Sequence, residues 1–194
     1  VLATGSYLME VKLPVGQYRF LAWVGVHESY DVTTPRSGYD MVDMRLRLKR
    51  EESCIIDKKL EPLWHGVSHR VDFTGTTNQI EVISLIKNTN KVRFVFQGYS
   101  GEDTRSVSGK SWGLDMNNYE IIESNGYMAY DNSLLDDDIL SFRPYYMEQK
   151  NSSAAVVELN TMRLMEDRQS RFVVTDKTTG RKVFSINLID YFAM

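Results

Sequence analysis

The stretch Leu13-Pro14-Val15-Gly16-Gln17-Tyr18-Arg19-Phe20-Leu21-Ala22-Trp23 decides the fold class of this chain. Apolar side chains recur at every second position on both sides of it, from Tyr7 to Leu13 and from Tyr18 to Val24. This period of two is typical of half-buried β-strands. Pro14 fixes its own backbone angle and Gly16 readily adopts a positive φ, so the residues between the runs suit a tight reversal. The stretch therefore predicts a hairpin of a β-sandwich or barrel, and it indicates no function.

Further runs of the same kind predict a chain built almost entirely of strands. They lie at 41–48, 67–73, 79–87, 91–99, 119–123, 127–130, 139–147 (interrupted by Pro144), 155–164, 171–175 and 182–188. The last two are expected to pair as a hairpin through 176–180, and 27–39 is expected to be a loop. The sequences at 88–90 and Asn125-Gly126 predict tight turns, which would make hairpins of the strands on either side. At most one helical turn is expected, near 165–169. One polar face on many of the strands predicts antiparallel sheets.

The number of predicted strands sets the domain organisation. About twelve strands exceed the seven to nine of one usual sandwich, so we place a boundary near Trp64. Residues 1–63 are expected to be the C-terminal part of a first β-sandwich domain, and 64–194 a second one. The predicted fold class is all-β, with two antiparallel sandwiches of which the first is present only in part. Because Val1 and Met194 lie close to predicted strands, we expect a trimmed piece of a longer precursor.

Composition is that of a soluble globular protein. The 194 residues are 42% hydrophobic and carry a net charge of −3, which argues against nucleic acid as a partner. No apolar run approaches the roughly 20 residues of a membrane-spanning helix. Cys54 is the only cysteine, so an internal disulfide and a cysteine-based zinc site are excluded. We expect Cys54 to be a small buried hydrophobic residue.

No residue pattern predicts a catalytic, cofactor-binding or metal site. His65 and His69 are four residues apart, but in a strand this spacing separates them by about 13 Å, and His27 is remote in sequence. The acidic run 136–138 lacks the ligand spacing of an EF-hand and is expected to be a solvated loop. Gly109-Lys110-Ser111 lacks the first glycine of a phosphate-binding loop. No cofactor is therefore predicted.

Aromatic side chains leave a binding function open. They could stack on sugars or simply pack at strand faces, and the candidates are Trp23, Trp64, Trp112, Tyr127, Tyr130, Tyr145 and Tyr146. A glycosidase would need two carboxylates, and nothing in the sequence selects two of the 26 acidic residues. A surface glycan-binding or adhesin module and, third, a secreted hydrolase remain as alternatives.

Short motifs in a fixed order carry a resemblance to a known family. The turn 13–18 running into Ala22-Trp23 resembles a signature of the fimbrillin-associated anchor proteins of Bacteroidales type V fimbriae. Leu63-Trp64-His65-Gly66 is similar to the family's element at the domain junction. Further similar segments follow in order at 83–90, 125–132, 144–145, 160–164 and 188–192. The resemblance spans almost the whole chain.

The resemblance implies a non-enzymatic structural protein of the bacterial surface. It implies two transthyretin-like β-sandwich domains, attached to the outer membrane by a lipidated N-terminal cysteine at the base of a fimbrium. Its partners would be fimbrial subunits, docked by addition of a strand to an open sheet edge. The chain departs from the family because Cys54 is internal and the family's N-terminal strands are absent. Its C-terminus also falls short of the family's usual end. A lipid is therefore expected on a precursor segment outside this sequence.

Overall fold

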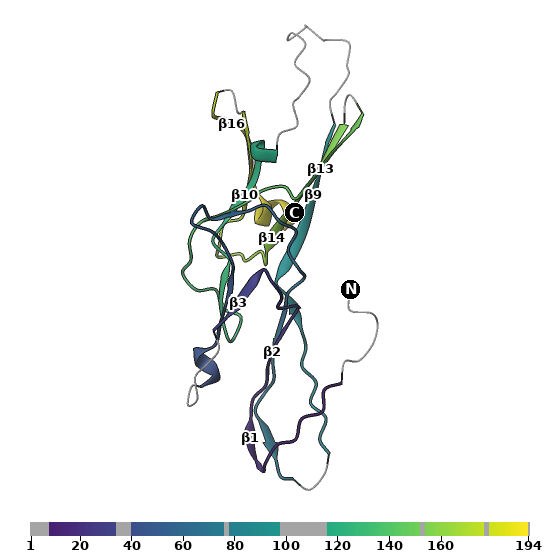
Figure 1. Cartoon of the computed structure of the whole chain (residues 1–194), viewed down its shortest axis with the longest axis vertical. Helices are drawn as coiled ribbons and strands as arrows, with labels where there is room; N and C mark the ends of the chain where they lie inside the picture. The colour runs from purple at the N-terminus through teal and green to yellow at the C-terminus, as the bar shows by residue number, and fades with distance from the viewer. Residues whose placement is uncertain are drawn as a thin grey trace.

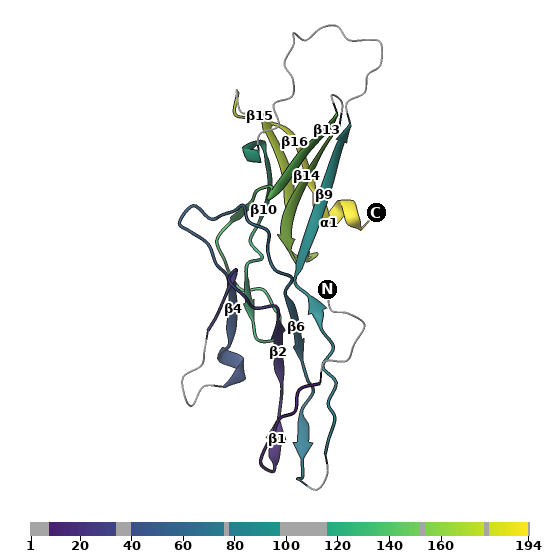
Figure 2. The ribbon, with the colours of Figure 1, turned by 45° about the vertical axis from the view of Figure 1, so that its right-hand side comes forward.

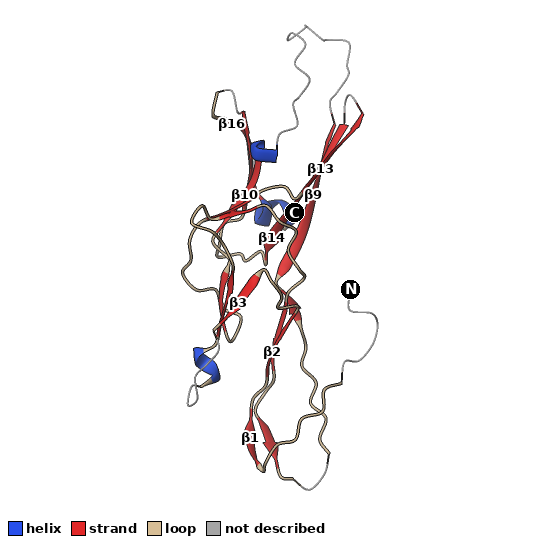
Figure 3. Ribbon diagram, in the orientation of Figure 1, coloured by secondary structure: helices blue, strands red, loops and turns tan. Residues whose placement is uncertain are grey.

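The computed structural model describes residues 8–33, 40–75, 78–97, 116–151, 154–176 and 179–193. They form an elongated body that is narrow at one end and wide at the other (Figure 1). Strands dominate it (Figure 3), and the described helices are short: η1 (Met41–Asp43), η2 (Met116–Asn118) and α1 (Leu188–Phe192). The predicted all-β fold class is confirmed. No helix of the described part is long and apolar enough to cross a membrane.

The wide end is a β-sandwich of two sheets, called the sandwich unit below. One sheet has five strands in the order β16 (Arg181–Asn187), β15 (Arg171–Asp176), β10 (Tyr119–Glu123), β12 (Leu140–Phe142) and β5 (Ile55–Ile56). The other has three, in the order β13 (Tyr146–Asn151), β14 (Ala154–Met162) and β9 (Thr89–Gln97). Neighbouring strands are antiparallel, except that β5 runs parallel to β12.

The core of the sandwich unit lies between its two sheets. Phe94 of β9 stacks on Phe172 of β15 with ring centroids 3.8 Å apart, and Phe96 packs on Tyr119 at 5.3 Å. Phe172, Ile121 and other apolar residues there are fully buried. The period-two pattern of β9 explains this arrangement, because it turns the phenylalanines inward and leaves Arg93 exposed.

The narrow end is built from small sheets, called the narrow unit below (Figure 2). Its strands are β1 (Gly16–Tyr18) paired with β7 (Val71–Phe73), and β2 (Leu21–Val24), β6 (Trp64–Val67) and β8 (Ile86–Lys87) in that order. A further small sheet, which we assign to neither unit, has the order β11 (Tyr127–Ala129), β4 (Arg45–Leu48) and β3 (Tyr30–Val32). Only Asn88 separates β8 from β9, so one stretch of chain links the two units.

Three predicted hairpins are wrong because their strands pair with distant partners. β1 and β2 pair with β7 and β6, and residues 8–15 contain no strand. β9 pairs with β14 over its whole length, while 78–85 is extended without a strand partner. β10 pairs with β12 and β15, whereas β11 pairs with β4. The apolar contacts with these distant strands outweigh the local preference for a turn, so the neighbouring strands do not pair with each other.

The Asn125-Gly126 dipeptide shows why its turn signal misleads. Asn125 is fully buried, and its side-chain amide donates to the carbonyl oxygen of Arg163 at 3.1 Å. A Cβ atom at Gly126 would lie 2.6 Å from a methyl carbon of Leu140, so a larger residue fits only if neighbouring side chains shift. The glycine serves close packing, and the asparagine bonds across the fold instead of closing a two-residue hairpin.

Other predictions of local structure hold better. The hairpin of β15 and β16, the long strand β14 and the break at Pro144 between β12 and β13 are confirmed. The last predicted strand extends to 188, but α1 begins at Leu188. Asn187 caps this helix, because its side chain accepts a hydrogen bond from the Ile189 N–H. β3 lies in a predicted loop, and η1 replaces the start of the strand at 41–48.

Pairings cross the predicted domain boundary. Four strand pairs join residues before and after position 63: β1–β7, β2–β6, β4–β11 and β5–β12. The first three belong to the small sheets and the fourth to the sandwich unit. The division into domains 1–63 and 64–194 stays a prediction. A boundary at this position would divide the strands of four sheets between the two domains.

Gly180, in the turn between β15 and β16, gives a test of the confirmed hairpin. Its φ is +65°, and an added Cβ would meet nothing within 4 Å. We therefore expect Gly180→Ala to lower the free energy of unfolding by about 1–2 kcal/mol through backbone strain alone. Gly180→Asn should cost less, because asparagine tolerates this conformation. Equal costs in urea denaturation would contradict the geometry.

Candidate functional site

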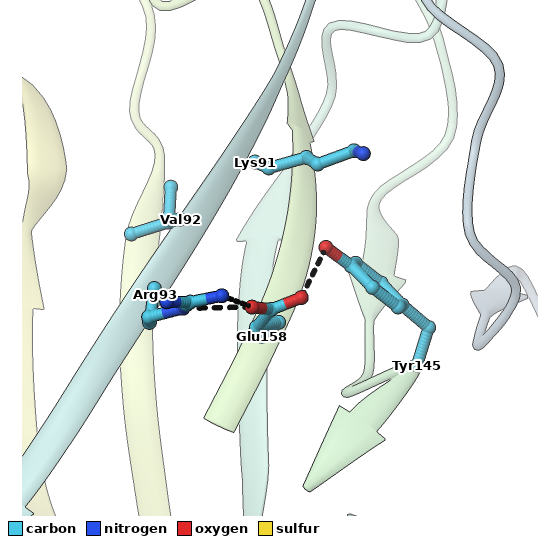
Figure 4. Close-up of a pocket in the computed structure, with 5 residues that line it drawn as sticks. All are labelled: Lys91, Val92, Arg93, Tyr145 and Glu158. Carbon is cyan, nitrogen blue, oxygen red and sulfur yellow. Dashed lines mark hydrogen bonds and ion pairs between the residues drawn. The ribbon is translucent and has the colours of Figure 1, made fainter. Parts of the chain in front are cut away.

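A pocket of about 300 Å³ lies on the outer face of the three-stranded sheet, lined by Lys91, Val92, Arg93, Tyr145 and Glu158 (Figure 4). Glu158 on β14 lies at its centre. One of its carboxylate oxygens accepts hydrogen bonds from Arg93, at 2.7 Å from Nε and more closely from Nη2. The other accepts the Tyr145 hydroxyl at 3.0 Å. Strand register explains the first contact, since Glu158 is directly opposite Arg93.

These contacts fix the charge of the pocket. The hydrogen bonds from Arg93 lower the pKa of Glu158, so the carboxylate stays ionised. Burial and the hydrogen bond to Glu158 raise the pKa of Tyr145 to about 12, which keeps the phenol protonated. The pocket thus offers an aromatic ring, a carboxylate and cations to a ligand. Neither Glu158 nor Tyr145 is therefore poised for proton transfer near neutral pH.

A second pocket, of about 390 Å³, lies where the narrow unit meets the sandwich unit. Its lining comes from β6, from β8 and the segment before it, from the loop after β11 and from Arg163: His65, Gly66, Val67, Ser84, Ile86, Asp131, Asn132, Ser133 and Arg163. His65 Nε2 lies 2.7 Å from the Tyr130 carbonyl oxygen, and burial lowers the pKa of His65. Burial also lowers the pKa of Arg163, which donates to the Asn132 carbonyl at 2.7 Å.

Asn88 and Asn132 pin this junction together. Their side-chain amides exchange two hydrogen bonds, of 2.6 and 3.1 Å, and both residues are buried. The backbone N–H of Asn88 also donates to the Leu63 carbonyl oxygen at 2.7 Å. A reciprocal amide pair satisfies two groups that would otherwise be buried without partners. It joins the link between β8 and β9 to the loop after β11.

The amide pair gives a second prediction. Asn88→Ala leaves the Asn132 amide buried without its partner, so we expect a loss of about 1–3 kcal/mol in the free energy of unfolding. Asn132→Ala should cost more, because the φ of +70° at this position also strains an alanine. The double variant should cost clearly less than the sum of the two single variants. A urea-denaturation double-mutant cycle measures this. Simple additivity would show that the two amides act independently.

A fully buried carboxyl group, Glu123, lies in the core of the sandwich unit. It accepts hydrogen bonds from the Met162 N–H at 2.6 Å, the Thr161 hydroxyl at 2.6 Å and the Ser170 hydroxyl at 2.7 Å. Burial raises the pKa of Glu123, while these three hydrogen bonds act in the opposite direction. The carboxyl ties β10 to the end of β14 and to the loop before β15. Its role is structural, since no pocket described above includes it.

The acidic run at 136–138 is only in part the solvated loop that its sequence predicts, since Asp136 and Asp138 are exposed and Asp137 is not. The side chain of Asp137 is fully buried and pairs with Arg50 at 2.7 Å and with Arg47 at 3.1 Å. Asp138 pairs with Arg47 at 3.0 Å, and the guanidinium of Arg47 lies 5.5 Å from the centre of the Tyr127 ring. Arginines on and just after β4 thus hold this loop against the small sheet. The sequence alone does not show that the arginine side chains of another segment pair with Asp137, so it predicts a solvated loop.

The histidines and the cysteine take structural or exposed positions. His65 is buried at the junction, whereas His27 and His69 are exposed. Among the described residues no group of three or more His, Cys, Asp or Glu side chains could hold a metal ion. Cys54 is half-buried against the core with a φ of +53°. Gly109-Lys110-Ser111 lies outside the described residues.

The candidate sugar-stacking aromatics do not form one platform. Tyr145 and Tyr146 lie near the Glu158 pocket, and Tyr127 lies under Arg47. Trp23 packs against the core, and its ring centroid lies 6.1 Å from that of His65. Trp64 and Tyr130 are half-buried, and Trp112 lies outside the described residues. No pattern in the sequence predicts the Arg93–Glu158–Tyr145 contacts, because they depend on the register of β9 against β14.

Open sheet edges and exposed apolar side chains mark the rest of the surface. The extended segments 8–15 and 78–85 of the narrow unit expose Leu8, Met9, Val15, Ile80 and Val82, each at least 70% accessible. In the sandwich unit, β9 and β16 are end strands of their sheets. Unpaired strand edges and apolar surface are features of proteins that assemble with other chains. A β-sandwich with such a surface is typical of the class of proteins that assemble with other chains.

Residues 2–194 match the family model described as fimbrillin-A associated anchor proteins Mfa1 and Mfa2. The chain belongs to this family and is a fimbrial or cell-surface structural protein. The family resemblance predicted from the sequence is thereby confirmed. A comparison with curated proteins found no match.

Solved structures share the fold. A candidate polysaccharide-binding protein from Bacteroides thetaiotaomicron is 55% identical, with a TM-score of 0.84 over 98% of this chain and 65% of its own. A candidate adhesin from Bacteroides ovatus is 22% identical, with a TM-score of 0.77 over 94% of this chain and 59% of its own. The fimbrial anchor protein Mfa2 from Porphyromonas gingivalis is 20% identical, with a TM-score of 0.68 over 92% of this chain and 62% of its own. The chain thus spans about two-thirds or less of each relative.

Proposed function

We propose that this protein is a fimbrial anchor or accessory subunit that tethers a fimbrium to the outer membrane and docks fimbrillin subunits through strand-mediated contacts. The observation that carries the proposal is the set of sheet edges without a described neighbour, in a member of an anchor-protein family. An extended segment of a partner gains backbone hydrogen bonds along such an edge, and alternate side chains fix its register. No chemical step is needed, and we expect no hydrolytic activity.

The exposed segments 8–15 and 78–85 support the proposal of a first sandwich present only in part. Their alternating apolar residues suit half-buried strands, yet Ile80 and Val82 are 78% and 83% accessible. The solved relatives extend beyond the matched region, so they hold additional chain that could cover such surface. We propose that further sequence of this protein completes the domain to which 1–63 belongs. The outer-membrane lipid would lie on that further sequence.

Binding of the purified chain to purified fimbrial subunits of the same bacterium tests the docking function. We expect one subunit to bind in surface plasmon resonance, with little effect of Val42→Asp, a change at an exposed residue of η1 outside the two units. Binding to no fimbrial subunit, together with clear binding to a glycan array, would contradict the proposal and favour the alternative below.

The alternative is a surface glycan-binding or adhesin module. It is favoured by the Glu158 pocket, whose tyrosine, carboxylate and arginine are groups that hydrogen-bond and stack on sugars. The 55% identical relative is named as a candidate polysaccharide-binding protein. If this function holds, Tyr145→Ala should abolish glycan binding, while Tyr191→Ala, at an exposed tyrosine of α1, should not.

A further inference from the structure

The Glu158 pocket contains one cation that no carboxylate neutralises. Arg93 is paired with Glu158, so these two charges compensate each other and both side chains are held in place. Lys91 also lines the pocket, two residues before Arg93 on β9, and it is exposed. No ion pair within the described part of the chain includes Lys91. Its ammonium group is therefore the charge that the pocket offers to a ligand.

A neighbouring segment brings more positive charge to this face of the sheet. Asn160 lies directly opposite Lys91 on β14, on the face that bears the pocket, and its side chain bonds to the segment between β5 and β6. The Asn160 amide donates to the Lys58 carbonyl oxygen at 2.6 Å, and its oxygen accepts the Leu60 N–H at 3.2 Å. Lys58 and Lys59 are both exposed. The segment thus places two more lysines beside the pocket.

The acids of the adjoining segments do not compensate these lysines. Burial and the Glu61 carboxylate raise the pKa of Tyr30, so the charge of Glu61 lies near that buried phenol. On β13, Glu148 is paired with Lys150 at 2.6 Å. Asp57 is exposed on the segment between β5 and β6, and it opposes only one of the three lysines. This part of the surface therefore favours a ligand with negative charge.

Tyr145 and Glu158 add the groups that recognise a sugar ring. The hydrogen bond between them holds the half-buried Tyr145 ring at the wall of the pocket, where it can stack on the apolar face of a sugar. A carboxylate offers about four acceptor positions, of which Arg93 and Tyr145 occupy three, so one remains for a hydroxyl group. Figure 4 shows Lys91 extending on the same side of the sheet as these groups. An acidic peptide side chain would use the lysine but not the aromatic ring.

We propose that the Glu158 pocket binds an acidic saccharide, with a sugar ring on Tyr145, a hydroxyl group on Glu158 and the negative group on Lys91. The lysines of the neighbouring segment attract the acidic chain to the pocket. The inference adds a binding activity to the proposed anchor function. It rests on the glycan-binding alternative, whose pocket it shares, and it adds the class of saccharide and the residue that selects it.

Acidic saccharides and their neutral counterparts test the choice of ligand. Isothermal titration calorimetry with the full chain would compare trigalacturonate with its methyl ester, and sialyllactose with lactose. We expect at least one acidic saccharide to bind, about tenfold or more tightly than its neutral counterpart. Its binding should weaken as salt is added, because the contact with the exposed Lys91 is ionic.

Variants identify the group that selects the charge. Lys91→Gln should weaken binding of the acidic saccharide about tenfold, to the level of its neutral counterpart, because it removes the free ammonium group. Lys182→Gln removes another exposed lysine, on β16 of the other sheet, and should leave binding unchanged. Tyr145→Ala should abolish binding of both kinds of saccharide. Circular dichroism checks that each variant is folded, and the exposed lysine variants provide the test if Tyr145→Ala is not.

Four outcomes would overturn the inference: no binding of either acidic saccharide, equal binding of acidic and neutral saccharides, binding that Lys91→Gln leaves unchanged, or a hexaglutamate peptide that binds as tightly and depends on Lys91 in the same way. The proposed functions can fail separately. If neutral saccharides bind equally well and Tyr145→Ala abolishes their binding, only the acidic class is wrong. If no saccharide binds but fimbrial subunits do, the anchor function stands without this pocket. If an acidic saccharide binds but no fimbrial subunit does, the anchor function is wrong.

Discussion

Phe172→Ala is expected to lower the free energy of unfolding by about 3–5 kcal/mol, the cost of removing a large aromatic side chain from a packed core. Phe172 is fully buried and lies at the centre of an aromatic cluster. The centroid of its ring lies 3.8 Å from that of Phe94, 6.2 Å from that of Phe184 and 6.4 Å from that of Phe96. These contacts join strands β9, β15 and β16, so the cavity would weaken the packing of the two sheets against each other.

Phe184→Ala is the matched control for this prediction. The same side chain is removed from the adjacent strand, but Phe184 is half exposed, so less apolar surface leaves water on folding. We expect a cost of about 1–2 kcal/mol in equilibrium urea denaturation. If both variants lost the same stability, the core would not be centred between β9 and β15.

Glu123→Ala is expected to cost about 2–4 kcal/mol, because the Met162 N–H and the hydroxyls of Thr161 and Ser170 lose their buried acceptor. Glu120→Ala on the same strand removes a half-buried carboxylate with one hydrogen bond, to Ser141, and should cost about 1 kcal/mol or less. Equal costs for the two variants would show that the buried hydrogen bonds of Glu123 contribute little.

The pH dependence of stability separates the charge of Glu123 from its hydrogen bonds. Burial raises the pKa of Glu123 in the folded state above its ordinary value of 4.5. The folded state therefore binds the proton more tightly, and this favours folding fully below pH 4.5. The benefit is lost as the pH rises through the folded-state pKa. Glu123→Gln replaces the carboxyl group with an amide of the same shape, which does not titrate in this range.

Wild type should accordingly lose stability relative to Glu123→Gln as the pH rises from 4.5, with a slope of at most about 1.4 kcal/mol per pH unit. Thermal melting of both proteins between pH 4 and 8 measures the difference. A constant difference across this range would mean that Glu123 has the same pKa in the folded and unfolded states.

The sequence predicted the fold class because alternation reports burial directly. It predicted the β15–β16 hairpin because that turn joins neighbouring strands. It failed at Leu13–Trp23 and Asn125-Gly126, where the strands on either side pair with partners distant in sequence. Pairing of this kind depends on which faces meet in the folded core, and turn propensity does not contain that information.

The candidate sites were hidden for a related reason. Glu158 meets Arg93 through the register of β14 on β9, and Asp137 is buried where it pairs with Arg50 and Arg47. From the sequence alone, Glu158 and Asp137 would each be predicted to be an exposed charged residue on a strand or loop. The family, in contrast, was accessible, because its motifs are short, local and ordered along the chain.

Hydrogen–deuterium exchange of the full chain, alone and with a purified fimbrial subunit that binds it, tests the central claim of strand-mediated docking most directly. Backbone amides on a free strand edge exchange quickly and slow down when a partner strand accepts their hydrogen bonds. We predict slower exchange in β9 on binding, with β10 in the middle of its sheet unchanged. A complex that leaves β9 and every other open edge unprotected, with changes confined to side-chain surfaces such as the Glu158 pocket, would contradict strand-mediated docking.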